Sequence, residues 1–247
     1  SGHLVVVPWL LKLDPPGFTF DVLVHLATLL AILLFFRAEL VMLVRGLIEL
    51  IARRRADTPA SRLAWLVIIS SIPAVLVALL LDSLIESAFG SPAAVAVFLL
   101  VTGTVLYLAE RGRGDRAMSE ITTSDAGLIG LAQAAALIPG ISRSGATMAT
   151  GMARGLARPE AARYAFVMSI PVILGAAGME LLDLVTQAGL TGSWGTLAIG
   201  MLAAFVSGYF AITVLFRFVQ RHSLRAFSFY CWGLGLLTLV VFLVRGA

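Results

Sequence analysis

The sequence has little charge and almost no cysteine. Of its 247 residues only 13% are charged, and Cys231 is the single cysteine. One cysteine cannot form an intrachain disulfide, which excludes a disulfide-stapled fold. Soluble domains carry about a quarter of their residues as charges, so the low value excludes an ordinary soluble protein. Hydrophobic residues make up 60% of the chain instead. The composition indicates a polytopic membrane protein with no large extramembrane domain.

The net charge of +4 does not indicate a nucleic-acid partner. The basic residues are spread over several short loops between apolar runs rather than gathered on one face, so no nucleic acid is predicted to bind. The chain starts at Ser1 without a basic segment and a cleavage site, so no signal peptide is recognised. We expect the sequence to be N-terminally shortened.

Six apolar runs are long enough to cross a bilayer, which takes about 20 residues. They are residues 20–36, 63–82, 92–109, 164–184, 195–217 and 226–244. Two shorter apolar pieces, 126–138 and 144–156, flank a polar break. Such a pair predicts a re-entrant hairpin over 126–156, since irregular backbone at membrane depth needs surrounding protein or water. One kinked span is the alternative. Residues 1–13 are also too short to cross, and we interpret them as the remnant of a first re-entrant segment.

Basic residues are unevenly distributed between the spans. Fifteen of the 18 Lys and Arg residues fall in four loops, at residues 37–62, 111–116, 154–163 and 217–225. All four lie on the cytoplasmic side if the 126–156 segment enters and leaves by the same face, whereas a full crossing would place two of them outside. The distribution therefore favours re-entry. We predict an all-α, polytopic integral membrane protein with one transmembrane domain over residues 1–247.

Two further patterns concern the organisation of the chain. Residues 38–52 are amphipathic and either extend the first span or lie along the cytoplasmic surface. Ser71-Ile72-Pro73 recurs as Ser169-Ile170-Pro171, each about a third of the way into a span. This echo by itself does not show inversion, but with the two short polar-tipped segments in different halves it predicts a duplicated architecture, an inverted repeat, with the functional site at the repeat interface, as in many transporters.

The polar break contains an arginine. An arginine at membrane depth costs several kcal/mol, so Arg143 marks a functional site. Hydroxyl groups and glycines surround it, in the run Pro139-Gly140-Ile141-Ser142-Arg143-Ser144-Gly145-Ala146-Thr147. A helix starting near Ser144 would add free N–H groups, which bind phosphate. The residues therefore predict an intramembrane phosphate site. The alternative is a small-residue helix contact beside a snorkelling arginine.

Residues 139–147 match the P-G-x-S-R-S-x-x-T signature of the bacterial undecaprenyl-diphosphate phosphatases, membrane enzymes associated with bacitracin resistance. Residues 20–28 and 72–75 resemble two other patterns of that family. The resemblance implies hydrolysis of undecaprenyl diphosphate to undecaprenyl phosphate and inorganic phosphate, which recycles the lipid carrier of peptidoglycan and other cell-wall polymers. It also implies the bacterial plasma membrane as location and a divalent metal ion, Mg²⁺ or Ca²⁺, and it is compatible with a homodimer.

The resemblance also assigns residues. It implies that the diphosphate is held by Gly140, Ser142, Arg143, Ser144, Gly145 and Thr147. His3 corresponds to a family histidine and is expected to act as general base or as nucleophile. Ser1 is a supporting residue, and His25 is expected to be buried and hydrogen-bonded rather than catalytic.

The N-terminus departs from the family pattern. Family members carry two glutamates, which are implied metal ligands, upstream of the motif of which Ser1-Gly2-His3 is the end. This chain by itself is therefore expected to lack metal binding and the phosphatase activity, even if the natural protein has both. Four acids are expected at headgroup level on the outer side, where one could assist a metal: Asp21, Asp82, Glu180 and Asp183. The rival interpretation is a transporter or flippase of a polyprenyl phosphate.

Overall fold

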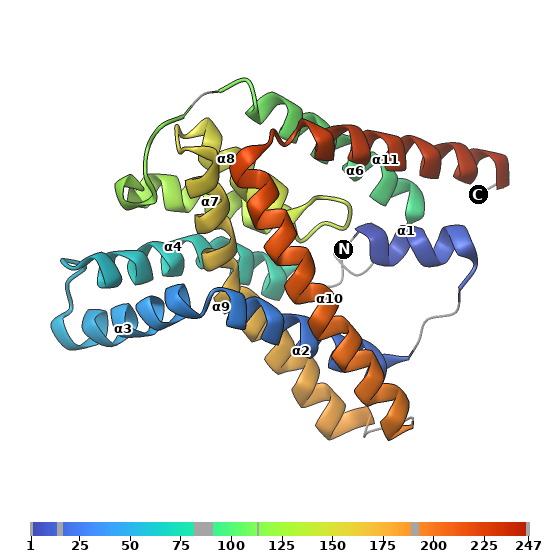
Figure 1. Cartoon of the computed structure of the whole chain (residues 1–247), viewed down its shortest axis with the longest axis horizontal. Coiled ribbons are helices and arrows are strands. Elements are labelled where there is room, and N and C mark those ends of the chain that lie inside the picture. The colour runs from blue at the N-terminus through green and yellow to red at the C-terminus, as the bar shows by residue number, and fades with distance from the viewer. Residues whose placement is uncertain (1, 14–16, 82–90, 113, 189–192, 246–247) are drawn as a thin grey trace.

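The computed structural model describes residues 2–13, 17–81, 91–112, 114–188 and 193–245 (Figure 1). Helices account for nearly all of this described part. In chain order they are α1 (Gly2–Leu11), α2 (Phe18–Phe35), α3 (Arg37–Arg53), α4 (Pro59–Leu80), α6 (Pro92–Ala109), the short η1 (Met118–Glu120), α7 (Thr123–Ala135), α8 (Arg143–Ala153), α9 (Arg158–Asp183), η2 (Leu184–Ala188), α10 (Trp194–Arg221) and α11 (Arg225–Arg245).

Within the described residues, six helices are long and apolar enough to cross a membrane, namely α2, α4, α6, α9, α10 and α11. Each overlaps a predicted span, so the polytopic all-α class is confirmed. The largest difference is at α9, which begins at Arg158 and not near 164. The first turns of α9 contain charged residues, and for that reason the sequence predicted a loop there. Arg158 forms an ion pair with Glu110 and Arg163 with Glu39, and these contacts let the helix start earlier.

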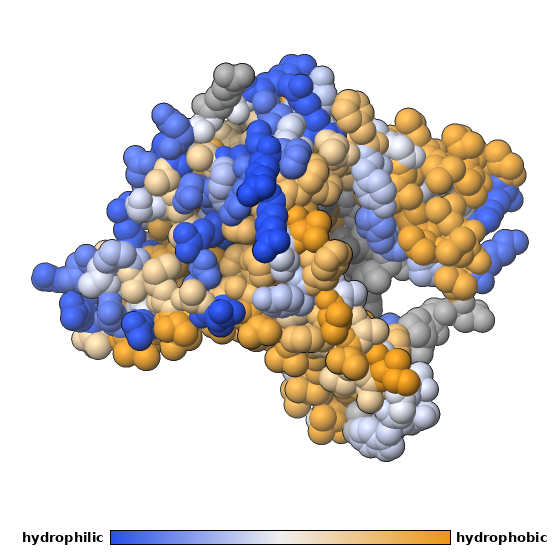
Figure 2. Space-filling view, in the orientation of Figure 1, coloured by the Kyte–Doolittle hydropathy of each residue, from blue (hydrophilic) through white to orange (hydrophobic). Residues whose placement is uncertain are grey.

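The surface of the isolated chain is apolar over these spans. On α10 the side chains of Ile199, Leu202 and Phe210 are mostly exposed. Large contiguous apolar surface is unfavourable in water, whereas in a bilayer it contacts lipid tails. Figure 2 shows hydrophobic side chains over much of the right and lower parts of the molecule, while hydrophilic ones gather at the left and the top.

Residues 38–52 form α3, which is not a straight extension of the first span. The chain turns at Phe36, which ends α2 and precedes α3. Beyond the turn α3 lies beside α4 (Figure 1). Gly46 makes the close approach possible, because a Cβ there would stand 2.0 Å from the carbonyl oxygen of Ala60. Thr58, in the α3–α4 connection, is the N-cap of α4. Its hydroxyl accepts the backbone N–H of Ser61 at 3.1 Å and donates to the Glu49 carboxylate of α3.

Helices α7 and α8 form a hairpin that is too short to cross a bilayer, with 13 and 11 residues. At its base the entering and leaving chains lie side by side, since the N–H of Arg116 donates to the carbonyl of Gly155 at 3.0 Å and the N–H of Ala157 donates to the carbonyl of Arg116 at 2.9 Å. Both ends of the hairpin are therefore at the same end of the molecule. Gly130 brings α7 close to α4, because a Cβ there would lie 2.6 Å from the carbonyl oxygen of Ser70.

The four arginine-rich loops meet at that end. The Glu110 carboxylate accepts two hydrogen bonds from the Arg158 guanidinium and one from the N–H of Leu224, each 2.8 Å long. Arg62 donates to the carbonyl of Ile121 at 3.1 Å. The prediction that these loops share one face is confirmed by their mutual contacts. Which side of a membrane they face stays a prediction.

The two Ser-Ile-Pro motifs lie on helices that touch. Ser71, Ile72 and Pro171 line one apolar groove of about 460 Å³ where α4 and α9 meet. Beside it the hydroxyls of Ser70 and Tyr164 are 2.9 Å apart. The motifs thus mark the contact between the two halves of the chain, and the inverted repeat itself stays a prediction.

Candidate active site

The tip of the hairpin begins a helix at the predicted arginine. Ser142 caps α8, because its Oγ accepts the N–H of Gly145 at 3.2 Å and its carbonyl accepts the N–H of Ala146 at 2.8 Å. The helix therefore starts at Arg143. The first N–H groups of an α-helix have no partner inside it and lie at the positive end of its dipole. Together they form an anion-binding position at the hairpin tip.

Arg143 itself is half-buried and lies at this helix start. In the described part of the chain its guanidinium takes part in no ion pair, unlike those of Arg116, Arg154 and Arg158. Its side chain lines a cavity together with other residues of the tip. A guanidinium held without a protein anion can bind two oxygens of a phosphate at once. This placement disfavours the alternative of an arginine snorkelling to the lipid surface.

A threonine on α6 holds the tip in place. The hydroxyl of Thr102 donates to the carbonyl of Gly140 at 2.9 Å and accepts the N–H of Ser142 at 3.1 Å. Gly140 has φ +96°, and a Cβ on it would lie 2.5 Å from the carbonyl oxygen of Val95. Only glycine fits there without strain. Sequence reasoning missed Thr102. The available signal is weak, because Thr102 is one of three hydroxyl residues inside this apolar span, with Thr104 and Tyr107.

One cavity of about 1,340 Å³ collects most of the predicted site residues. From the hairpin tip it is lined by Gly140, Ser142, Arg143, Ser144 and Gly145, and from other helices by Gly2, His3, His25, Glu180 and Tyr230. His3 and Arg143 therefore face one space although they belong to α1 and α8. The structure brings the two ends of the predicted site together.

Two predicted residues are not placed in the cavity. Thr147 is buried behind the tip, and its hydroxyl donates to the carbonyl of Arg143 at 2.8 Å and to that of Ser144 at 3.2 Å. It supports the first turn of α8 from behind, and its contact with phosphate stays a prediction. Ser1 lies outside the described residues.

His3 meets a tyrosine that sequence reasoning did not single out. Its Nε2 lies 2.6 Å from the Tyr230 hydroxyl, and the two rings stack with centroids 5.6 Å apart and planes 12° apart. Tyr230 belongs to α11 and also lines the cavity. No local pattern indicates it, because it is one aromatic residue among several in an apolar span.

His25 was expected to be buried, and this is wrong. Its side chain is 57% exposed, and its Nδ1 lies 3.7 Å from Oε2 of Glu180. Both side chains line the cavity, so α2 and α9 bring a histidine and a carboxylate to its wall. The headgroup-level position expected for Glu180 stays a prediction. Asp82 lies outside the described residues.

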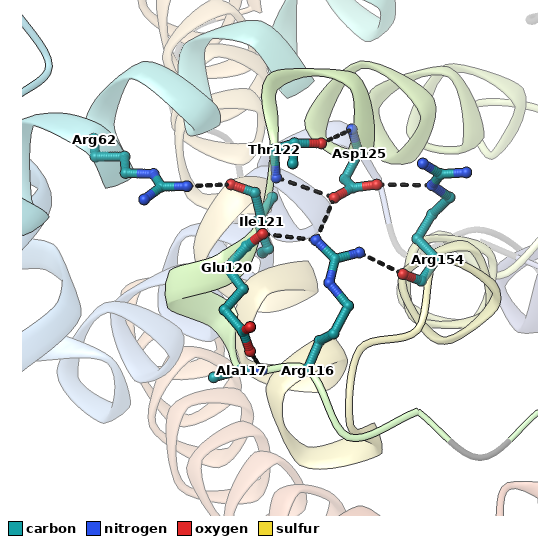
Figure 3. A network of polar contacts seen from close by, with 8 residues as sticks. All are labelled: Arg62, Arg116, Ala117, Glu120, Ile121, Thr122, Asp125 and Arg154. Atoms are coloured by element: carbon teal, nitrogen blue, oxygen red, sulfur yellow. Dashed lines mark hydrogen bonds and ion pairs between the residues drawn. The ribbon is translucent and has the colours of Figure 1, made fainter.

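The base of the hairpin is closed by a buried carboxylate (Figure 3). Asp125 has no exposed surface; its Oδ2 lies 2.9 Å from Nη2 of Arg116 and its Oδ1 lies 2.7 Å from Nε of Arg154. Arg116 also donates to the carbonyls of Arg154 and Glu120, each at 2.6 Å. The carboxylate thus joins the chain entering the hairpin to the chain leaving it.

The surroundings of Asp125 hold it in the charged form. Burial by itself would raise the pKa of this carboxyl. Hydrogen bonds from Thr122, Arg154 and Arg116 lower the pKa by a larger amount, so the net pKa is well below the usual value. Thr122 and Asp125 also form the capping box of α7. That Thr-x-x-Asp spacing is the local signal by which the sequence could have indicated the residue.

Comparison with known proteins identifies the family. The family described as bacitracin resistance protein BacA matches residues 1–237. The chain belongs to the BacA family. Three curated relatives, each named undecaprenyl-diphosphatase, cover most of it. The Pelobacter propionicus protein is 44% identical over 93% of this chain and 85% of its own length. The Thermomicrobium roseum protein is 42% identical over 98% and 90%, and the Desulforudis audaxviator protein is 40% identical over 100% and 91%.

Membership of the BacA family agrees with the resemblance carried by residues 139–147. The described residues of this BacA-family chain contain no group of three or more His, Cys, Asp or Glu side chains that could hold a metal ion. The His25 and Glu180 pair offers two ligands at most. The described side chains alone therefore do not form a complete metal site.

Proposed function

We propose that this protein hydrolyses undecaprenyl diphosphate to undecaprenyl phosphate and inorganic phosphate, and so recycles the lipid carrier of cell-wall synthesis. The observation that carries the proposal is the placement of Arg143 at the start of α8, half-buried and facing the same cavity as His3. Relatives at 40% identity and above are named undecaprenyl-diphosphatase. Protection against bacitracin is expected to accompany this activity, in keeping with the family's description.

The tip of the hairpin binds the diphosphate. This group carries several negative charges, and charge on the transferred phosphoryl oxygens must be stabilised during the reaction. Arg143 supplies a planar fork of donors, and the first N–H groups of α8 supply further donors with the helix dipole. The Oγ of Ser142 already accepts the N–H of Gly145, so its O–H is free to donate to phosphate. Ser144 lines the cavity beside it.

His3 supplies the ring nitrogen that the chemistry needs. A general base must accept a proton from water, and a nucleophile must attack phosphorus with a lone pair. Both roles require an imidazole nitrogen that carries no proton. His3 lines the cavity from α1, whose first turn lies against the hairpin tip.

The apolar part of the cavity accepts the isoprenyl tail. Phe210, Val214, Phe218 and Phe227 line it from α10 and α11. Phe210 and Val214 are also exposed on the outside of the chain, at 69% and 47%. A tail there can stay in contact with the bilayer while the diphosphate enters the polar part, and its transfer from lipid into this part of the cavity costs little because both surroundings are apolar.

A divalent cation, Mg²⁺ or Ca²⁺, is proposed to accompany the diphosphate, on the basis of the family resemblance. When bound, it would neutralise phosphate charge. The described side chains by themselves do not form a complete site for the ion. Treating the purified protein with EDTA should stop phosphate release, and either cation should restore it. Full activity in EDTA would contradict this part of the proposal.

The protein is proposed to lie in the bacterial plasma membrane with its four arginine-rich loops in the cytoplasm and the cavity open outward. Asp57 and Ser193 are exposed near opposite ends of spans. In a Cys231→Ser background, Asp57→Cys and Ser193→Cys should differ in labelling by an impermeant maleimide added to intact cells, with only position 193 reacting. Labelling at position 57 alone would reverse the orientation. A homodimer stays a prediction, which light scattering in detergent tests.

Phosphate release is the deciding experiment. The purified full-length protein is supplied with an isoprenyl diphosphate and Mg²⁺ or Ca²⁺, and inorganic phosphate is measured. Arg143→Lys should lower kcat/KM by about 100-fold or more, because lysine is a point charge without the bidentate fork. Arg55→Lys is the matched control, since Arg55 lies exposed in a loop, and it should leave the rate unchanged. Lipid binding without phosphate release by the unmodified protein would contradict the proposal.

Transport of a polyprenyl phosphate is a second candidate function. The cavity is lined by Glu180, near the end of α9, and also by Leu224, in the connection at the arginine-rich end. A cavity with lining at both ends suits the passage of a lipid headgroup. The test is movement of a fluorescent polyprenyl phosphate between leaflets of proteoliposomes. Transport that persists in Arg143→Lys without phosphate release would favour this function.

A further inference from the structure

The C-terminal helix holds the first helix at both ends. At one end Tyr230 of α11 contacts His3, with 2.6 Å between its hydroxyl and Nε2. At the other end Arg245 donates from Nη1 to the carbonyl of Trp9 and from Nη2 to that of Leu10, both at 3.0 Å. The Arg245 guanidinium also lies over the Trp9 ring, 5.1 Å from its centroid. A cation at the C-terminal end of α1 satisfies free carbonyls and complements the helix dipole.

Helix α6 fixes α1 from another direction. Val6 has no exposed surface and packs with Val95 and Leu99 of α6. At the start of α1, a Cβ on Gly2 would lie 3.4 Å from the Cα of Gly140. Helix α1 thus contacts α11 at both of its ends and packs on α6 through Val6, and its first turn lies against the hairpin tip. The position of His3 relative to Arg143 depends on both helices.

The hydrogen bond to Tyr230 bears on the proton of His3. A neutral imidazole has one N–H, and a tyrosine hydroxyl can either accept it or donate to the bare nitrogen, so the direction of this hydrogen bond is linked to the tautomer of His3. If Nε2–H donates to the Tyr230 oxygen, Nδ1 keeps a free lone pair. Among the described residues, Tyr230 is the hydrogen-bonding partner of this ring. The stacked rings, 12° apart in plane, also limit rotation of the imidazole.

We propose that Tyr230 is a positioning residue for His3: its hydroxyl oxygen accepts Nε2–H, and this holds Nδ1 free of a proton and turned into the cavity for the reaction. The inference rests on the proposed phosphatase function, but it does not depend on whether His3 acts as base or as nucleophile. In either role the reacting nitrogen must be unprotonated. Tyr230 takes the part that a carboxylate or a backbone carbonyl takes beside many catalytic histidines.

Tyr230→Phe tests the proposal in the full-length protein, because phenylalanine keeps the stacked ring and removes the hydroxyl. The expected result is a fall in kcat of about 10- to 100-fold, the usual effect of losing an orienting hydrogen bond, with KM changed less than about twofold. In a His3→Ala background, Tyr230→Phe should cause no further loss, since the hydroxyl acts through His3. Tyr209→Phe is the matched control and should have the unmodified kcat, because the Tyr209 ring packs on Phe35 away from His3.

A second measurement is independent of turnover. With only three histidines in the chain, nitrogen NMR of imidazole-labelled protein can resolve His3 from His25 and His222. The unmodified protein should show the Nε2–H form of His3, and Tyr230→Phe a mixture of both forms. A normal kcat in Tyr230→Phe, an additional loss in the His3→Ala background, or an Nδ1–H form of His3 in the unmodified protein would each overturn the inference. Absence of phosphate release from the unmodified protein would instead overturn the proposed function.

Discussion

Gly2 and Gly140 lie against each other, with 3.4 Å between a Cβ built on Gly2 and the Cα of Gly140. One begins α1 and the other lies in the tip of the α7–α8 hairpin, and neither element is long enough to cross a bilayer. Two short elements therefore meet inside the protein. Each places one polar side chain, His3 or Arg143, at the same cavity. The site consists of two halves that only the fold joins.

Gly140→Ala should disrupt the hairpin tip. The residue has φ +96°, and its added Cβ would meet the carbonyl oxygen of Val95 at 2.5 Å. Backbone strain and the forced shift should cost about 1–3 kcal/mol of stability and reduce phosphate release, since Arg143 moves with the tip. Thermal unfolding in detergent and the phosphate assay measure both.

Gly127→Ala is the matched control for that substitution. Gly127 lies in α7, and a Cβ there would meet nothing within 4 Å. Alanine should leave activity unchanged and stabilise the helix by up to about 1 kcal/mol. If the two glycine variants unfold at the same temperature and release phosphate equally, close packing of the tip on α6 has no role.

Thr102→Val should weaken the hold on the tip without changing side-chain volume much. It leaves the carbonyl of Gly140 and the N–H of Ser142 without their shared partner. Loss of two buried hydrogen bonds should cost about 1–3 kcal/mol, and displacement of Ser142 and Arg143 should lower kcat/KM about 10- to 100-fold. Thr213→Val, which removes only a bond to the carbonyl of Tyr209 in its own helix, should change neither quantity appreciably.

Asp125→Asn should destabilise the base of the hairpin. The amide cannot compensate the charges of Arg116 and Arg154, which both bind the carboxylate. Because these arginines are 30% and 44% exposed, water compensates part of the loss, and we expect about 2 kcal/mol. Chemical unfolding monitored by circular dichroism measures it. Asp115→Asn, at an exposed loop position, should unfold like the unmodified protein.

The pH dependence of stability should also report Asp125. Its pKa is lowered in the folded state, so the carboxylate contributes its full stability above the unfolded pKa of about 3.9 and loses it as pH falls toward the lower folded value. The difference in unfolding temperature between the unmodified protein and Asp125→Asn should therefore be constant near neutral pH and narrow below about pH 4. A difference that stays constant down to pH 3 would show that the charge of Asp125 is not what stabilises the base.

Local signals predicted much of this protein because they depend on neighbouring residues only. Apolar length located the six spans, and the proline and glycine before Ser142 located the break between α7 and α8. The predicted burial of His25 failed because its environment depends on α9, whose Glu180 lies 3.7 Å from the imidazole while both side chains line the cavity. The predicted start of α9 near residue 164 failed for a related reason. The helix begins earlier because ion pairs with other helices stabilise its charged first turns.

By itself the sequence determined the membrane class, the basic loops and the position of Arg143 between two half-length helices, because hydrophobic length and charge are properties of the chain at each point. Only the tertiary structure decided that His3 reaches the same cavity, that Thr102 holds the hairpin tip and that Tyr230 contacts His3. These contacts join residues up to 227 positions apart. Hydrogen bonds of that separation leave no period or spacing in the sequence, since the packing of whole helices decides which side chains meet.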